Sequence, residues 1–392
     1  MAITTAPWSA PSVAHSSAQS TAQSTAPSAP SNGGTRRAQP RPRRERGSHL
    51  SDFTALTARI KAEGLLARSH GYYWAKLIGL PLALAGIVVL SFTLGDTWWQ
   101  MALAVAFALV MAQVGYLGHD AAHRQIFASA KWNKWVSLIV LNLIAGMGFG
   151  WWQGKHNKHH AKPNMADADP DIGTGAFAYT PEGVRSRRTA FGRWITPRQS
   201  YYFFPLLLLA GLQLHINGTQ RLLRRGTVKN RWVELAFIAI RHGALITFAF
   251  LAMSPVIAVS FLLVQVMVFG FYLAMTFAPN HIGMPILPKD VKIDFLRRQV
   301  LMSRNISGGR VVDTLMGGLN FQIEHHLFPS MSRPNLRRAA PIVREYCRDL
   351  GVNYHVTSLP RSYVEVASYL NRVGRGGIDL WSCPLAGALR TV

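Results

Sequence analysis

Residues 76–94 read KLIGLPLALAGIVVLSFTL, and residues 97–117 read TWWQMALAVAFALVMAQVGYL. Each run has close to the ~20 apolar residues that an α-helix needs to cross a ~30 Å hydrocarbon core. Only Gly95 and Asp96 separate the two runs. The sequence therefore predicts two membrane-spanning helices joined as a hairpin.

A second pair of apolar runs occupies residues 236–253 and 256–278. Two further runs, 135–150 and 201–214, are too short for a comfortable crossing, and we expect them to be interfacial or re-entrant. The expected fold class is therefore an all-α membrane protein with four transmembrane helices in two hairpins.

The composition agrees with a membrane protein. The 392-residue chain is 49% hydrophobic and only 15% charged, whereas soluble domains carry about 25% charged residues. Its two cysteines, Cys347 and Cys383, are too few for a disulfide framework or a thiolate zinc site.

The distribution of charge predicts the orientation of the chain. The net charge is +24, and the Lys and Arg residues cluster beside the apolar runs while both hairpin tips lack them. This pattern favours a cytoplasmic, membrane-facing basic surface over nucleic-acid binding. By the positive-inside rule, we expect the N-terminus, the C-terminus and the active site on the cytoplasmic side.

The domain organisation expected is a tail followed by one membrane domain. Residues 1–50 are rich in Ala, Ser, Thr, Pro and Gln and become basic, which predicts a disordered tail, with an organelle transit peptide as the alternative. Residues 51–392 form the membrane domain. Arg241 lies early in the third span, where it either snorkels to the interface or is a buried functional charge.

Three histidine clusters indicate the chemistry. They are HDAAH at 119–123, HNKHH at 156–160 and QIEHH at 322–326. On a helix, spacings of three and four put imidazoles on one face, so that a single helix can present several nitrogens to one metal ion. The predicted topology brings all three clusters to one membrane face, together with His281, which follows the fourth run.

Eight imidazoles are too many for one ion, so we expect two metal ions with about four nitrogens each. A nitrogen-rich set suits iron, copper or zinc. The candidate ligands are His119, His123, His156, His159, His160, His281, His325 and His326. The other ring N–H of each ligand needs an acceptor, and the candidates are Asp120, Asp167, Asp169, Asp171 and Glu324.

The boxes HDAAH, HNKHH and QIEHH, in this order and placement, resemble the three histidine boxes of integral-membrane fatty acid desaturases. The resemblance covers about residues 75–335. It implies four membrane helices below a cytoplasmic helical cap that holds a di-iron site. It also implies that the box histidines and His281 bind two iron ions, with O2 as co-substrate.

Gln322 departs from the pattern of many acyl-CoA Δ9 desaturases, in which the third box begins with His. Gln resembles the front-end desaturases, which act between an existing double bond and the carboxyl end. Gln322 could be a weak ligand, a hydrogen-bonding group behind the ligands or a spacer. The chain has no HPGG haem motif of a fused cytochrome b5, so the resemblance implies a separate electron donor: a ferredoxin, a cytochrome b5 or a flavoprotein reductase.

The expected activity is O2-dependent removal of two hydrogens from an acyl chain of acyl-CoA or a phospholipid. An unactivated methylene has no polar handle, so a narrow apolar tunnel must position it. We expect its lining to include Trp151, Trp152, Phe269, Phe271, Tyr272 and Met275.

Two other functions fit parts of the pattern. A di-iron lipid hydroxylase uses the same residues, and the sequence does not separate it from a desaturase. A metal transporter needs polar groups within the spans, and spans one, two and four have few. The basic surface could attract an acidic electron carrier, the phosphates of coenzyme A or anionic membrane lipids.

Overall fold

The computed structural model describes residues 51–377, except for 174, 225, 227 and 290. The tail predicted at 1–50 and Cys383 lie outside the described residues. The described chain is mostly helical and contains two short strands, β1 (Asn305–Ser307) and β2 (Val356–Ser358), which pair in parallel.

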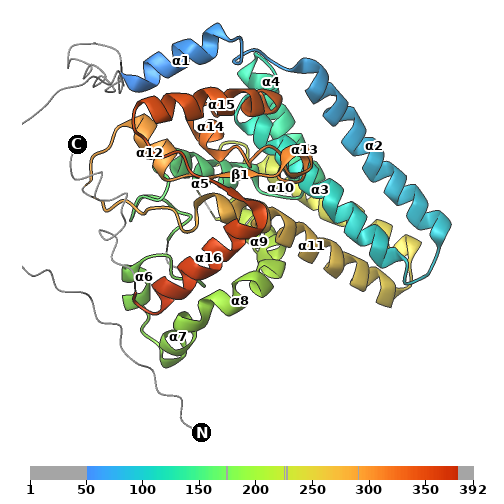
Figure 1. Ribbon diagram of the computed structural model, residues 1–392. Helices are drawn as coiled ribbons and strands as arrows, with labels where there is room; N and C mark the ends of the chain where they lie inside the picture. The colour runs from blue at the N-terminus through green and yellow to red at the C-terminus, as the bar shows by residue number, and fades with distance from the viewer. Residues whose placement is uncertain (1–50, 174, 225, 227, 290, 378–392) are drawn as a thin grey trace, which may run out of the picture. The chain divides into compact units, whose positions relative to one another are not determined.

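Four helices are long and apolar enough to cross a membrane, so the prediction of an all-α membrane protein is confirmed at this level. Each of them packs against at least one of the others (Figure 1). They are α2 (His70–Leu94), α3 (Gln100–Ala122), α10 (Arg231–Ala252) and α11 (Pro255–His281). The helices α3 and α11 run beyond the predicted apolar stretches, and each therefore carries a histidine of the candidate site at its C-terminal end.

The short connections of the two helix pairs lie together. Gly95 ends α2 with a positive φ of 72°, a conformation that glycine adopts without strain. Asp96 follows it, and its Oδ1 accepts a hydrogen bond of 2.7 Å from the backbone N–H of Ser254, between α10 and α11. The ends of α2 and α10 are therefore at the same level of the helix group.

The run predicted at 135–150 forms a sharp bend. It contains the last three residues of α4 (Ala130–Ser137), all of η1 (Leu138–Ile144), which is a π-helix, and the start of α5 (Phe149–Ala161). The chain bends by 118° between the two arms of this segment, the geometry of a broken span or a re-entrant loop. The helix that carries the second histidine box, α5, thus begins immediately after a sharp bend of the backbone.

A buried carboxylate from α10 stabilises the start of α5. Glu234 Oε2 accepts hydrogen bonds from Gly150 N (2.9 Å) and from Asn142 Nδ2 (3.0 Å). The first N–H groups of a helix have no partners within it, and a negative charge there also interacts favourably with the helix dipole. Glu234 therefore joins η1, α5 and α10 at one point.

Arg241 bonds to the chain at the other side of this bend. Its Nε donates to the carbonyl oxygen of Ile144 at 2.6 Å, and its guanidinium lies over the ring of Phe107. His215 Nδ1 donates to the carbonyl oxygen of Gly146 at 2.9 Å. The side chain of Arg241 is thus half-buried and contacts the bend and the ring of Phe107.

The segment between α5 and α10 is a series of short helices that leads into the amphipathic helix α9. They are α6 (Pro181–Arg185), α7 (Ala190–Ile195), η2 (Thr196–Arg198), α8 (Gln199–Leu206), η3 (Leu207–Leu209) and α9 (Ala210–Leu223). The run predicted at 201–214 lies in this series and is not among the four membrane-length helices.

The helix α9 crosses α11 at backbone contact. A methyl group on Gly270 would lie 1.8 Å from Gly211 N, and one on Gly211 would lie 2.2 Å from Val266 O. Seven residues further along α9, Gly218 makes a similar contact with Gly148 at the start of α5. Glycine is therefore required at both crossings, because only it lets the backbones approach this closely.

Of the six remaining helices in the described chain, four share a second apolar core. The six are α1 (Asp52–Ala62), α12 (Phe295–Leu301), α13 (Gly309–Leu315), α14 (Gln322–Leu327), α15 (Arg333–Asp349) and α16 (Leu359–Gly374). Leu56, Val300, Ile323 and Val343 are fully buried and join α1, α12, α14 and α15. This core fixes α14, which carries the third histidine box.

We predict that Gly270→Ala destabilises the folded chain by about 1–3 kcal/mol or more, because the methyl group overpacks the α9–α11 crossing. Gly243→Ala in α10 is the matched control, since nothing lies within 4 Å of its added carbon and alanine favours a helix. The midpoint of thermal unfolding in detergent measures both variants. Equal unfolding midpoints for Gly270→Ala and Gly243→Ala would contradict the close contact of the α9 and α11 backbones at Gly270.

Candidate metal centre

Four segments bring their histidines to one place. His119 and His123 come from the end of α3, three histidines come from α5, His281 ends α11, and the last two lie on α14. Their ligand atoms form two groups, and within each group they lie within 4.8 Å of one another. The first group is His119, His123, His156, His160 and His325, and the second is His159, His281 and His326.

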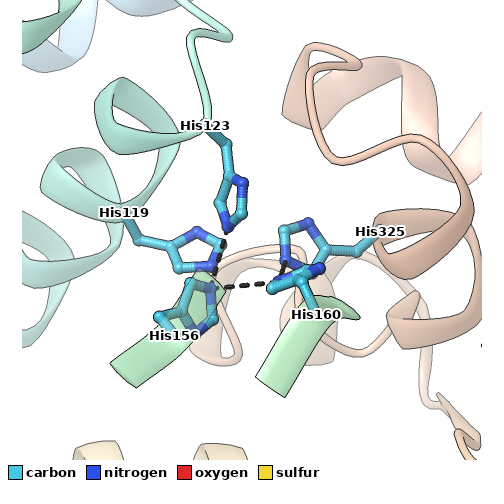
Figure 2. A group of neighbouring side chains, drawn as sticks. All are labelled: His119, His123, His156, His160 and His325. Atoms are coloured by element: carbon cyan, nitrogen blue, oxygen red, sulfur yellow. Dashed lines mark hydrogen bonds between the residues drawn. The ribbon is translucent and has the colours of Figure 1, made fainter. Parts of the chain in front are cut away.

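The first group has its ring nitrogens turned toward a common centre (Figure 2). His156 Nε2 lies 2.8 Å from His123 Nε2 and 3.0 Å from His160 Nε2. His325 Nε2 lies 3.1 Å from His160 Nε2. The ring of His119 closes the group, with its centroid 4.7 Å from that of His123.

The second group has three imidazoles whose Nδ1 atoms are each held by an acceptor. His159 Nδ1 donates to Asp169 Oδ2 (2.9 Å) and His281 Nδ1 to the carbonyl oxygen of Met302 (2.9 Å). His326 Nδ1 donates to Gln299 Oε1 (3.0 Å). A proton on Nδ1 leaves the lone pair on Nε2, and His159 Nε2 and His281 Nε2 are 3.2 Å apart.

The division into five and three differs from the expected four and four. Its cause is helix geometry: successive residues are rotated by about 100°, and residues four apart share a face. His156 and His160 on α5 therefore face the first group, while His159 faces the second. In the same way the adjacent residues His325 and His326 belong to different groups.

The donor set fits metal ions. Several buried imidazole nitrogens have no hydrogen-bond partner among the described residues, and buried polar atoms without a partner are rare in folded proteins. They include both ring nitrogens of His119 and Nε2 of His326, whereas the unpartnered atoms of His160 and His325 are the Nδ1 nitrogens, on the ring side away from the clustered Nε2 atoms. Nitrogens gathered at about 3 Å from one another suit cations such as iron, copper or zinc.

The environment keeps most of these imidazoles neutral, as metal ligands must be. Burial, followed by the charge of neighbouring imidazoles, lowers the pKa of the following residues well below the usual value: His123, His156, His160, His325 and His326. Burial opposes protonation of His159 too, but its hydrogen bond to Asp169 and the charge of Asp171 prevail and raise the pKa of His159.

Gln322 lies beside the group with fewer nitrogens. Its Nε2 is 2.9 Å from His281 Nε2, and its Oε1 accepts a hydrogen bond of 3.0 Å from Asn280 Nδ2. The side chain of Gln322 therefore contacts the second group directly and is part of its surroundings.

The acidic candidates occupy different places. Asp169 and Asp171 lie 2.9 and 3.3 Å from His159 Nδ1. Asp120 lies 3.6 Å from His119 Nδ1 and forms an ion pair of 2.6 Å with the buried Arg333. Asp167 is exposed and belongs to neither group.

Glu324 bonds away from the imidazoles. Its Oε2 accepts from Asn305 Nδ2 and its Oε1 from the hydroxyl of Tyr354, both at 2.7 Å. The expected contact with a ligand histidine is therefore not made, because Glu324 lies on another face of α14 from Gln322 and His326. Burial raises the pKa of Glu324 to about 7.

Sequence reasoning missed three polar contributors. Gln299 accepts from His326 and donates to the carbonyl oxygen of His160 at 3.0 Å, so it joins α5 to α14. The backbone oxygen of Met302 accepts a hydrogen bond from His281, and Arg333 forms an ion pair with Asp120, which lies beside His119. None lies in a histidine box, and a backbone acceptor leaves no signal in side-chain identity.

A mostly apolar cavity of about 510 Å³ reaches the histidines. Its wall includes His119, His159 and Gln322, together with Leu273 and Gly270 of α11. Trp151 and Trp152 line it as expected. The other four predicted residues pack elsewhere: Phe269, Phe271, Tyr272 and Met275.

The fold and the site define a class: a membrane protein with a histidine-rich site that could hold metal, next to an apolar cavity. The fatty acid desaturase family model matches residues 96–358, and the chain belongs to this family. It is therefore an oxidoreductase, as the resemblance of the histidine boxes predicted.

Named relatives agree with the family. The chain is 29% identical to the Delta(6)-fatty-acid desaturase fat-3 of Caenorhabditis elegans, over 78% of this chain and 71% of the relative. It is 29% identical to an acyl-lipid (9-3)-desaturase of Physcomitrium patens, over 88% of this chain and 66% of the relative. It is 28% identical to a Delta(8)-fatty-acid desaturase of Helianthus annuus, over 77% and 69%. The chain thus spans about two thirds of the length of such relatives.

We predict that Asp169→Asn weakens metal binding by about 10–100-fold, because the carboxylate that fixes the His159 ring is replaced by a neutral amide, which is a weaker acceptor. Asp167→Asn is the matched control, since Asp167 is exposed and its positive φ of 62° suits asparagine. Competition with a chelator, followed by metal analysis of the purified protein, measures the affinity. Equal affinities in the two variants would show that Asp169 does not support a ligand.

Proposed function

We propose that this protein is an O2-dependent fatty acid desaturase that introduces a cis double bond into an acyl chain of acyl-CoA or a phospholipid. The observation that carries the proposal is the pair of imidazole groups with members in the wall of a mostly apolar cavity, in a chain of the desaturase family. Family membership favours desaturation over hydroxylation, which the same residues could support.

The residues proposed to hold two iron ions are those of the two groups. His119, His123, His156, His160 and His325 form one site, and His159, His281 and His326 form the other. Gln322 is the fourth polar side chain at the second site. When bound, iron supplies the activation of O2 that removing hydrogen from an unactivated methylene requires.

The chain itself positions the substrate. The cavity holds the acyl chain along α11, its apolar wall excludes water, and the distance from the acyl head group to the histidines selects the methylenes that lose hydrogen. Gln322 and the relatives named Delta(6) and Delta(8) support a front-end position, on the carboxyl side of an existing double bond.

The topology proposed has four spans in two hairpins within a domain of residues 51–392. The contact of Asp96 with Ser254 supports placing both hairpin tips on one side of the membrane. The basic residues then face the cytoplasm, together with the N-terminus, the C-terminus and a helical cap containing the imidazoles. Electrons come from a separate ferredoxin, cytochrome b5 or flavoprotein reductase.

Expression of the full chain in a host that supplies an electron donor tests the activity. We expect new unsaturated fatty acids, located by mass spectrometry of their methyl esters. His159→Ala should abolish them, while His355→Ala, outside both groups, should retain them. Products that gain oxygen without losing two hydrogens would overturn desaturation in favour of hydroxylation.

We predict that Gly115→Leu shifts the products toward shorter acyl chains. Gly115 lines the cavity one turn before His119, and the nearest atom to an added carbon is 3.7 Å away, so the helix accepts a side chain that fills the cavity. Gly243→Leu, outside the cavity wall, is the control. An unchanged chain-length profile for Gly115→Leu would contradict acyl binding in this cavity.

A further inference from the structure

The helix α14 separates the acyl cavity from a second hollow. Gln322 lines the cavity, whereas Glu324, two residues on and about 200° around the helix, bonds to the wall of the hollow. This hollow has a volume of about 730 Å³. Residues of its wall include Asn305, Phe321, Arg344, Arg348 and Tyr354.

Hydrogen bonds connect the wall of the hollow to Glu324, the residue that precedes His325 of the first imidazole group. The hydroxyl of Tyr354 and Nδ2 of Asn305 both donate to the carboxylate of Glu324, at 2.7 Å each. Glu324 is fully buried and is followed in the chain by His325. Two hydrogen bonds and one peptide unit therefore join the wall of the hollow to a proposed iron ligand.

The rim of the hollow is basic. Arg344 and Arg348 lie four residues apart on α15, both exposed, and share one face of that helix. Glu345 also lines the hollow but is paired with Arg59 at 2.5 Å. Arg348 contacts Glu345 and Asp349 only at 3.5–3.7 Å, and no ion pair joins Arg344 to another described residue. An excess of positive charge is thus left at the surface.

We propose that this hollow, with Arg344 and Arg348 at its rim, is the docking site of an acidic one-electron carrier protein. The proposal rests on the proposed desaturase function. In each turnover the acyl chain loses two hydrogens and gains a C=C bond, and O2 is reduced to two waters. The remaining two electrons come from two successive carrier molecules, each oxidised by one electron, and two protons come from the solvent.

The geometry gives the carrier a route that does not compete with the substrate. The acyl chain occupies the cavity on the Gln322 side of α14, and the carrier docks on the Glu324 side. Electron transfer becomes steeply faster as the distance shortens, and on this face Glu324, the residue before His325, bonds to the wall of the hollow. Opposite charges also steer the encounter, which raises association rates at low salt.

The test uses the full chain, loaded with iron, in lipid nanodiscs. Reduced [2Fe–2S] ferredoxin and the reduced haem domain of cytochrome b5 are each mixed with the oxidised protein without oxygen, and stopped-flow absorbance follows reduction of the iron. We expect Arg344→Glu with Arg348→Glu to slow this reduction about tenfold or more at low salt. Arg344→Lys with Arg348→Lys should restore the rate.

Arg338→Glu is the matched control, because Arg338 is exposed on α15 but does not line the hollow. Its reduction rate should stay within about twofold of the wild-type rate. An equal loss in this control, an unchanged rate in the double Glu variant, or no reduction by either carrier would overturn the docking site. A raised KM for the acyl substrate with normal reduction would assign the arginines to substrate instead.

A second readout separates this proposal from the proposed function. Iron-loaded protein is reduced with dithionite, freed of the reductant and exposed to O2 once, and the double bonds are counted. The double Glu variant should give the wild-type yield, because chemical reduction bypasses docking. Failure of the wild type in this assay would refute the desaturase function itself, whatever the carriers do.

Discussion

Imidazole lone pairs must converge from four separate segments of the chain, and this requirement explains much of the structure. Imidazole nitrogens that are buried about 3 Å from one another are costly to hold together without a cation. The chain holds them by using the other ring nitrogen: Asp169, Gln299 and the Met302 carbonyl each fix one ring of the second group. The order of the site thus depends on residues outside the boxes.

The bend before α5 serves the same requirement. The second box must start close to the ends of α3 and α11, so the preceding run turns back through 118°. A turn of this kind exposes backbone groups that a membrane interior cannot solvate. Glu234, Arg241 and His215 satisfy several of them, which gives polar side chains of α9 and α10 a structural role.

The sequence was sufficient to predict the membrane-length helices, because twenty apolar residues in a row have few alternatives, and to select the histidines, because their spacing matches a helix face. It did not predict how they divide, since that depends on how α5 and α14 are rotated relative to each other. Glu324 looked like a partner for a neighbouring imidazole, but its rotation on α14 takes it to Tyr354. The roles of Gln299 and Met302 could not be predicted from the sequence, because they arise only from tertiary contacts with His326 and His281.

Within six residues, α14 lines the acyl cavity with Gln322, bonds to the wall of the second hollow through Glu324 and supplies His325 and His326 to the two imidazole groups. Inserting or deleting one residue here would turn every side chain beyond it by about 100°, moving several functions out of place together. An insertion or deletion in this segment would therefore disturb the cavity wall and both imidazole groups at once. Replacement of a single side chain, such as Gln322, changes one contact and leaves the others in place.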